Sequence, residues 1–528
     1  MSSAKIRNMA IVVVAVAMMC APAVTSLSVN EKENTLIATT TMEKATIVFP
    51  ANDGNSMIGY MGNVQISSGT TDEEHPTIVK APDGSFLVAY DCRLSGIEGH
   101  VYFMRSTDNG NTWSEIWNTN VDIGEMKNGV QTWPVLCTPP GGQAIYGSWN
   151  DEALDIIFFI NISNPSDPGS YGEKIYGYDA SGWDYERHTF TIAAFDENRF
   201  AVGHVGHIEF GGYDLPSSCQ ICCFTGGFSG GFGITGDEDY PIGYNNEVAV
   251  TSSLFWMIWD FPNEASGTSD LLLKWGDPGE ESDCHLWPDK EITSNKDYVD
   301  PALDASGDNL CIVYMTNDNI YGDWDLACKY STDEGGTWHD GTFPSMAQAD
   351  EKSPEIFVSG STVFCTFVRN GNLYLTKSTD LGQMWEEPEQ INEVDGTVVD
   401  EEGAVEVSPA GIVWVDTRNG NKDIYYAPLP CAIINVNSIS GGMGISATIT
   451  NTGTEDASNM DWSIELTGLI FIGKETTGTI DSLPAGGEEA IKSGLVFGIG
   501  PTTITITAGG ASKTAKGFVL GPLVLGVK

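Results

Sequence analysis

Ser106-Thr-Asp-Asn-Gly-Asn-Thr-Trp113 is the first of three copies of one turn pattern, S-T-D-x-G-x-x-W, which returns at residues 331–338 and 378–385. The Asp carboxylate can accept bonds from backbone N–H groups within a tight turn. The Gly supplies a positive φ, and the Trp buries a large ring to anchor the next strand. A repeated turn implies a repeated structural unit. We therefore assign a structural role to these residues: Asp108, Gly110, Trp113, Asp333, Gly335, Trp338, Asp380, Gly382 and Trp385.

A second pattern marks the unit itself, an apolar strand that ends in a polar or charged residue. It recurs at residues 86–91, 144–151, 200–204, 255–260, 310–318, 363–369 and 412–416. The spacing of roughly fifty residues is that of propeller blades with four short strands. We predict an all-β fold, a β-propeller of seven blades over residues 45–430, with six blades as the alternative. A strand at residues 63–67 would complete the last blade and join the ring without exposed edges.

The triple turn resembles the Asp-box, or BNR repeat, of sialidase-type β-propellers. In sialidases the first blade opens with Arg-Ile-Pro, and that arginine joins two others to clamp the substrate carboxylate. Here the aligned residues are Glu74-His75-Pro76, so His75 stands near the place of the clamp arginine. The resemblance therefore implies the fold without implying sialidase activity.

The N-terminal sequence and the net charge predict where the protein is located and which partners it can bind. Residues 1–26 read as a signal peptide, with Lys5 and Arg7 before an apolar run, and residues 27–44 as a flexible polar arm. We expect a secreted, extracellular monomer, with cell-surface association left open and no membrane-spanning segment. The net charge of −47 argues against nucleic acids and anionic membranes as partners. No metal site or cofactor is assigned, although calcium is the candidate ion for so acidic a chain.

Export permits disulfides among the ten remaining cysteines. Cys311 and Cys328 sit on consecutive expected strands and could pair. We favour disulfides for the Cys219, Cys222 and Cys223 cluster, with zinc as the alternative because His204 and His207 are near in sequence.

Residues 431–528 change character, with fewer charges and more Gly, Thr and Ile. Residues 445–453 and 461–466 alternate as strands do. This segment resembles the immunoglobulin-like C-terminal modules of secreted archaeal proteins, around Asn451-Thr-Gly453, residues 461–464 and residues 517–523. We expect a spacer or attachment module without chemistry of its own.

Strand direction separates the turns from the candidate site. In an antiparallel blade the Asp-box turn lies opposite the start of strand one and the end of strand two, so a ring gathers these latter residues around one channel mouth. The catalytic candidates are Asp91, Arg93, Asp151, Arg187, Asp260, Asp318, Arg369, Asp416 and Arg418. The ligand-binding candidates are His75, Trp133, Trp149, His188 and His204. Asp91 with Arg93 and Asp416 with Arg418 could instead be local ion pairs.

Three functions remain open. The first is a binding propeller that recognises extracellular glycans or cell-surface polymers, because no local catalytic signature is present. The second is a glycoside hydrolase that uses two of the mouth carboxyl groups. The third is a polysaccharide lyase or metal-dependent enzyme with His75, His188 or His204 as base or ligand. The missing clamp favours binding over catalysis.

Overall fold

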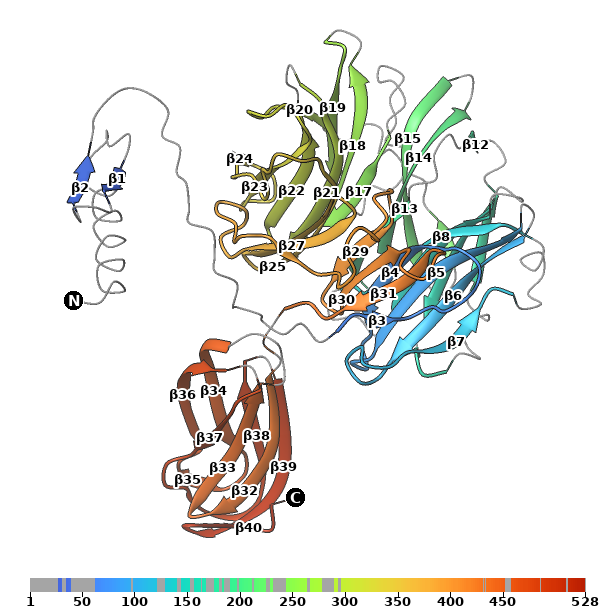
Figure 1. The fold of residues 1–528 in the computed structure, drawn as a ribbon. Coiled ribbons are helices and arrows are strands. Elements are labelled where there is room, and N and C mark those ends of the chain that lie inside the picture. The colour runs from blue at the N-terminus through green and yellow to red at the C-terminus, as the bar shows by residue number, and fades with distance from the viewer. Residues whose placement is uncertain are drawn as a thin grey trace. The chain divides into compact units, whose positions relative to one another are not determined.

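The computed structural model is all-β: within the residues that it describes, every regular element is a strand and no helix is present (Figure 1). No described helix is therefore long and apolar enough to cross a membrane. The described residues are 27–30, 35–38, 62–95, 98–120, 129–139, 144–151, 156–162, 164–167, 175–179, 183–184, 190–196, 199–210, 213–224, 228–230, 244–263, 266–277, 289–292, 296–430, 432, 434–451, 457–484, 486–509 and 511–527.

The chain divides into two compact units, residues 1–58 and 59–528. In the first, β1 (Leu27–Asn30) pairs antiparallel with β2 (Thr35–Ala38). The sequence analysis did not predict this pairing, because it reads residues 27–44 as a polar arm. The predicted signal peptide lies outside the described residues.

The second unit begins with seven sheets, which we call blades I to VII. Blade I contains β4 (Glu73–Lys80), β5 (Phe86–Ser95), β6 (Glu98–Ser106) and β7 (Ser114–Asn118). Blade II contains β8 (Gln131–Cys137), β9 (Ile145–Asp151), β10 (Ile156–Ile162) and β11 (Ile175–Asp179). Blade III contains β12 (Trp183–Asp184), β13 (Phe190–Asp196), β14 (Arg199–Phe210), β15 (Tyr213–Phe224) and β16 (Phe228–Gly230). Blades IV and V contain β17 (Asn246–Val250), β18 (Phe255–Asn263), β19 (Thr268–Gly276), β20 (Asp289–Ile292); and β21 (Tyr298–Ser306), β22 (Asn309–Thr316), β23 (Asp325–Ser331), β24 (His339–Asp340). Blades VI and VII contain β25 (Glu351–Ser359), β26 (Thr362–Arg369), β27 (Asn372–Ser378), β28 (Glu389–Gln390); and β29 (Val405–Ser408), β30 (Gly411–Asp416), β31 (Asp423–Ala427) with β3 (Val64–Gln65).

The first strands of the seven blades contact one another in a cycle. In chain order β4 contacts β8, then β13, β17, β21, β25 and β29 follow, and β29 contacts β4. The last blade takes its outer strand from the start of the unit, since β3 pairs antiparallel with β31. All seven second strands predicted from the sequence are present, and so is the predicted completing strand. Buried aliphatic and aromatic side chains fill the spaces between neighbouring blades.

The three S-T-D-x-G-x-x-W turns have the same hydrogen bonds. In each, the Ser hydroxyl donates to the Asp Oδ1 at 2.8 Å, as Ser106 does to Asp108. The Gly N–H donates to that Ser oxygen at 2.8–2.9 Å. The N–H four residues after the Asp donates to its carboxylate at 2.7–2.9 Å. The turn is therefore a closed local network, as the residue types predict.

The glycine of each turn has a positive φ and also lies too close to a neighbouring side chain to carry a Cβ. Gly110, Gly335 and Gly382 have φ values of 84°, 75° and 86°. A Cβ on Gly110 would lie 2.1 Å from the Tyr426 ring, and one on Gly335 would lie 2.1 Å from Trp256. Both rings belong to the preceding blade. The turns thus fasten one blade to the previous one, a contact that the pattern alone does not reveal.

The tryptophans of the turns are half-buried and also reach the preceding blade. Trp113 packs edge-on against Tyr426, and Trp338 packs edge-on against Trp256. Trp385 donates from Nε1 to the Thr342 carbonyl at 3.2 Å. Each Trp therefore contacts the preceding blade, an interaction that the predicted role of anchoring the following strand does not include.

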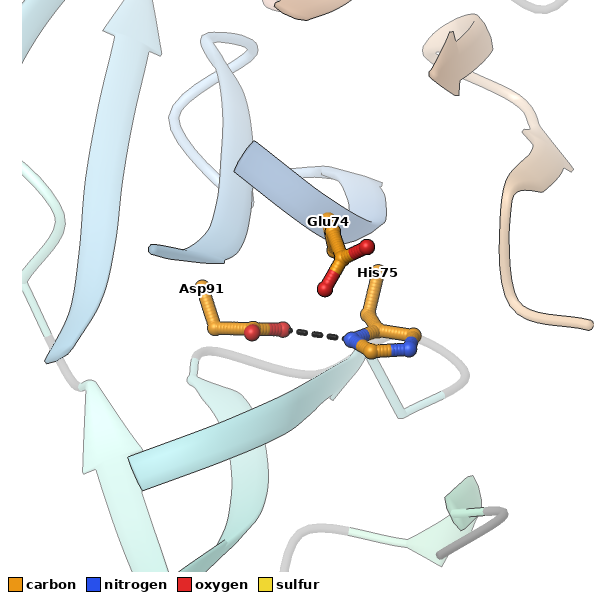
Figure 2. A group of neighbouring side chains, drawn as sticks. All are labelled: Glu74, His75 and Asp91. Atoms are coloured by element: carbon orange, nitrogen blue, oxygen red, sulfur yellow. Dashed lines mark hydrogen bonds and ion pairs between the residues drawn. The ribbon is translucent and has the colours of Figure 1, made fainter. Parts of the chain in front are cut away.

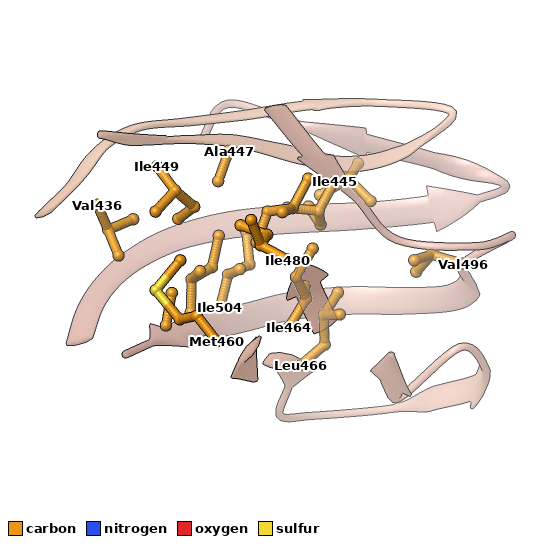
Figure 3. Packing of buried hydrophobic residues seen from close by; sticks show 14 of the residues in the cluster. Val436, Ile445, Ala447, Ile449, Met460, Ile464, Leu466, Ile480, Val496 and Ile504 are labelled. Carbon is orange, nitrogen blue, oxygen red and sulfur yellow. The ribbon is translucent and has the colours of Figure 1, made fainter. Parts of the chain in front are cut away.

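The C-terminal segment folds as two sheets over one core (Figure 3). The smaller sheet contains β32 (Ile434–Gly442), β33 (Gly444–Asn451) and β37 (Glu488–Lys492). The larger contains β34 (Ala457–Leu466), β35 (Ile470–Ile472), β36 (Glu475–Leu483), β38 (Phe497–Ala508), β39 (Ala511–Gly521) and β40 (Leu523–Leu525). Ile449, Ile464 and Ile504 from the two sheets belong to the same buried cluster.

Cys311 and Cys328 lie on the adjacent strands β22 and β23, as expected, but they do not form a disulfide. Both are buried free thiols, and their sulfur atoms are 3.7 Å apart. The side chains of Cys219, Cys222 and Cys223 lie outside the described residues.

Candidate functional site

A cavity of about 370 Å³ runs between the first strands, and all seven blades contribute to its wall. Its lining includes the acidic residues Glu247, Asp300, Asp304, Glu355, Glu402 and Glu406. Among the described residues that line it, none is Lys or Arg. The cavity is therefore a strongly acidic environment.

Four first strands share a bulge at the mouth of this cavity. His75, Trp133, Asp300 and Ser353 each precede a proline, and each has a φ between 48° and 54°. The strand register shifts at the same place in all four, as between Glu74 and Thr77. Such bulges re-aim side chains and often lie beside functional sites. The strand-start residues predicted as ligand contacts, His75 and Trp133, are the ones that this bulge presents.

His75, Asp91 and Trp133 form one connected group. His75 Nδ1 lies 2.7 Å from Asp91 Oδ1 (Figure 2). Asp91 Oδ1 also accepts the backbone N–H of Trp133 at 3.1 Å. The imidazole stacks on the Trp133 ring, with ring centroids 3.9 Å apart. Asp91 thus holds the His75 ring and the Trp133 backbone, and its bond to Nδ1 leaves Nε2 for a ligand.

Gly403 of blade VII completes this group, and sequence reasoning missed it. Its φ is 68°, and a Cβ there would lie 2.7 Å from the Trp133 ring and 3.1 Å from His75. A glycine is therefore required for the chain to approach both rings.

Glu74 extends the group towards blade VII. Glu74, His75 and Asp91 each place a donor atom within 4.8 Å of the others, which is close enough for a metal ion (Figure 2). Two of those donors are already bonded to each other, through His75 Nδ1 and Asp91. Glu74 also forms an ion pair with Lys422, which pairs with Glu401. The arrangement therefore fits a hydrogen-bonded dyad better than a metal centre.

Burial shifts the pKa of the cavity carboxyl groups upwards. It raises the pKa of Glu247 and of Glu406 to about 8. Burial, followed by the neighbouring Asp260 carboxylate, raises the pKa of Asp300 to about 7. Such groups can hold a proton near neutral pH, which is the property of a general acid.

Two further buried acids were not anticipated, and each belongs to a pair in which an acid that begins a first strand meets one that begins a third strand. Glu73 begins β4, and burial and the nearby Asp423 raise its pKa to about 7. Asp325 begins β23, and burial together with Glu351 raises its pKa to about 8. In both pairs, Glu73 with Asp423 and Asp325 with Glu351, the two acids come from adjacent blades. No local motif marks them, because the partners are far apart in sequence.

Most of the predicted strand-end aspartates accept hydrogen bonds from backbone N–H groups. Asp260 accepts the N–H groups of Tyr244, Asn245 and Asp300. Asp151 accepts the Val130 N–H at 3.2 Å and is fully buried. Asp318 follows the end of β22 and is exposed. These contacts support structural roles for Asp151 and Asp260.

Trp149 is corrected from a ligand-binding candidate to a core residue. It is 1% exposed and packs against Phe103 and Phe158, so no ligand can stack on it. Its predicted counterpart Trp133 is the one that lines the cavity.

The arginines do not assemble a clamp in the described structure. Arg418 forms two hydrogen bonds with the Asp416 carboxylate, at 2.7 and 3.0 Å, which confirms the predicted local pair. Arg369 pairs with Glu351 at 3.3 Å, and Arg93 is exposed. Arg187 and His188 lie outside the described residues, as does the side chain of His204 on β14.

No protein-family model matches the chain, and no curated protein matches it. Solved structures do resemble it. A protein of unknown function from Dyadobacter fermentans has a TM-score of 0.41 at 10% identity, covering 70% of this chain and 97% of its own. An α-L-arabinanase from Penicillium chrysogenum has a TM-score of 0.35 at 14% identity, covering 70% and 98%. A sialidase from Trypanosoma rangeli has a TM-score of 0.35 at 11% identity, covering 87% of both chains.

Proposed function

We propose that this chain is a secreted, monomeric glycan-binding protein, built from a closed seven-bladed Asp-box propeller and an immunoglobulin-like sandwich. The cycle of contacts among first strands and the pairing of β3 with β31 support closure. The apolar run after Lys5 and Arg7 supports export. The glycan binds at the mouth of the cavity.

The stack of His75 on Trp133 carries this proposal. Sugars present apolar C–H faces that pack on aromatic rings and hydroxyls that bond to polar groups, so a binding site needs both together. Here Asp91 holds the His75 ring and the Trp133 backbone, and Glu74 lies beside His75.

The charge of the cavity selects the kind of glycan. An anionic sugar would find Glu247, Glu355 and Glu406 and no Lys or Arg among the described lining residues. Its charge would then be buried without a cationic partner, which is costly. We therefore infer a neutral or amino sugar as the ligand, and not a sialic or uronic acid.

A glycan array followed by calorimetry tests the proposal. We expect binding of neutral or amino-sugar glycans, and at least about tenfold weaker binding for Trp133→Ala. Trp117→Ala is a matched control, because Trp117 packs on Phe103 in blade I and does not line the cavity. Selective binding of sialylated glycans, or equal losses for both variants, would contradict the proposal.

Glycoside hydrolysis is the second candidate, favoured by the raised pKa of cavity carboxyl groups. A glycosidase needs one protonated acid at working pH, and Asp300, with a pKa of about 7, meets that need in the cavity. The lyase hypothesis is less favoured, because its acidic substrates would find no Lys or Arg among the described lining residues. A panel of fluorogenic glycosides tests hydrolysis: release that Asp300→Asn abolishes, while Asp318→Asn leaves it unchanged, would establish it. Absence of release from every substrate would leave binding alone.

A further inference from the structure

The larger sheet of the C-terminal sandwich carries an exposed apolar face at one end. Its members are Phe497, Ile499, Phe518, Leu520, Leu523 and Leu525, which are 40–52% exposed. The intervening residues Val519 and Val524 are buried in the core. Alternation along the strands therefore places the apolar face on the outside of the sheet.

The strand register makes this face continuous. Leu520 of β39 stands opposite Ile499 of β38 and Leu523 of β40. In the next row, Phe518 stands opposite Pro501 and Leu525. Directly opposed side chains on one face of a sheet lie in contact range. Large apolar residues gathered in this way mark an interaction surface, unlike apolar residues that are scattered singly.

The charge around the apolar face differs from that of the rest of the chain. The chain has a net charge of −47, yet no Asp or Glu follows Glu489, while Lys492, Lys513, Lys516 and Lys528 do. Lys516 is exposed and directly follows the apolar rows, opposite Thr503. The nearest strand acids of this sheet, Glu465 and Glu475, lie on β34 and β36, and Glu465 is paired with Thr505 beyond the apolar rows.

We propose that this face docks the protein on an anionic lipid surface. The apolar side chains enter the boundary between headgroups and acyl chains, and Lys516 bonds to the phosphates at its edge, since lysine can extend its charged end to that depth. Salt screens charges beyond about 8–10 Å, so the charges near this face matter most for the contact. This proposal departs from the expectation, drawn from the net charge, that anionic membranes are not partners.

Vesicle flotation with the purified chain tests the proposal. We expect binding to phosphatidylglycerol vesicles and weaker binding to phosphatidylcholine vesicles. Phe518→Ser combined with Leu520→Ser removes two inserted side chains, so partition falls by about a hundredfold. Lys516→Gln leaves the apolar rows intact and lowers partition about fivefold, only for the anionic vesicles.

A control pair and a second measurement keep the test decisive. Ile320→Ser combined with Met384→Ser removes two even more exposed apolar side chains from the blades and should change nothing. Thermal denaturation verifies that every variant is folded. No flotation of the folded wild-type chain overturns the proposal. So does concentration-dependent dimerisation in sedimentation that Phe518→Ser with Leu520→Ser abolishes, because the face would then bind a second copy.

Discussion

The S-T-D-x-G-x-x-W turns and the cavity both contain aspartate carboxyl groups, but the pKa of these groups is shifted in opposite directions. In the turn, the hydroxyl and backbone N–H of Thr112 and the Ser106 hydroxyl lower the pKa of the exposed Asp108. In the cavity, burial raises the pKa of Asp304 to about 7. An anion therefore stabilises the turn, whereas it destabilises the wall of the cavity. The place of a carboxyl group in the blade, and not the abundance of acids, decides its role.

The largest expected effect is on stability against pH. A carboxyl group whose pKa is raised on folding contributes stability below its unfolded value, and this is lost as pH rises through the folded value. Glu73 and Asp300, at about 7, and Glu247 and Glu406, at about 8, place that loss between about pH 4.5 and pH 8. We expect the melting temperature to be roughly 5–10 °C higher at pH 5 than at pH 8. Calorimetry at constant ionic strength measures it, and a melting temperature that rises with pH would refute it.

A glycine substitution separates the turn from an ordinary positive-φ position. Gly110→Ala forces a Cβ against Tyr426 at a φ of 84°, whereas Gly84→Ala has a φ of 86° with no atom within 4 Å. Strain alone costs about 1–2 kcal/mol, and the clash adds about 1–3 kcal/mol in the first variant only. Urea denaturation should therefore find Gly110→Ala less stable than Gly84→Ala by that second amount. Equal losses would mean that the turn does not fasten the blades.

Sequence could predict the turns because their bonds are local. Ser106, Asp108, Gly110 and Thr112 bond to one another within seven residues, so their spacing is visible in the pattern. The seven second strands were found for a similar reason, since each is a short apolar run with a polar end. Both the predicted turns and the predicted second strands are present in the structure.

The site depends on contacts between distant segments. Asp91 holds His75 sixteen residues away and Trp133 forty-two residues away, and Gly403 reaches them from the last blade. No pattern in one sequence reveals such distances, which is why Trp149 and Trp133 could not be told apart. One signal was readable: His75, Trp133, Asp300 and Ser353 all precede Pro at the start of a first strand, and all form the bulge.

A smaller effect is expected from Asp333→Asn in the turn. The amide keeps the shape but loses the charge that accepts the Thr337 N–H at 2.7 Å and the Ser331 hydroxyl at 2.8 Å. Hydrogen bonds to a charged acceptor are stronger than those to a neutral one, and solvent weakens both at this exposed site. We expect a small loss of stability in urea denaturation, equal at pH 5 and at pH 8. A loss at only one of these pH values would show that the turn is coupled to another titrating group.

The corresponding substitution in the cavity, Asp304→Asn, is expected to change the free energy of unfolding least. Its sign at pH 8 should be opposite to that of Asp333→Asn. Asparagine keeps an oxygen for the Val358 N–H, which bonds to Asp304 at 2.6 Å, and carries no charge to bury. Because burial raises the pKa of Asp304 to about 7, the wild-type group is ionised at pH 8 and protonated at pH 5. Asp304 is only partly buried, so solvent screens the charge, and we expect the variant to be more stable by only about 1 kcal/mol at pH 8 and unchanged at pH 5. Urea denaturation of Asp304→Asn and Asp333→Asn at both pH values should therefore give opposite signs at pH 8. If Asp304→Asn destabilises the protein at pH 8, the cavity carboxylate stabilises the blades as the turn carboxylates do, and the contrast between the two regions is lost.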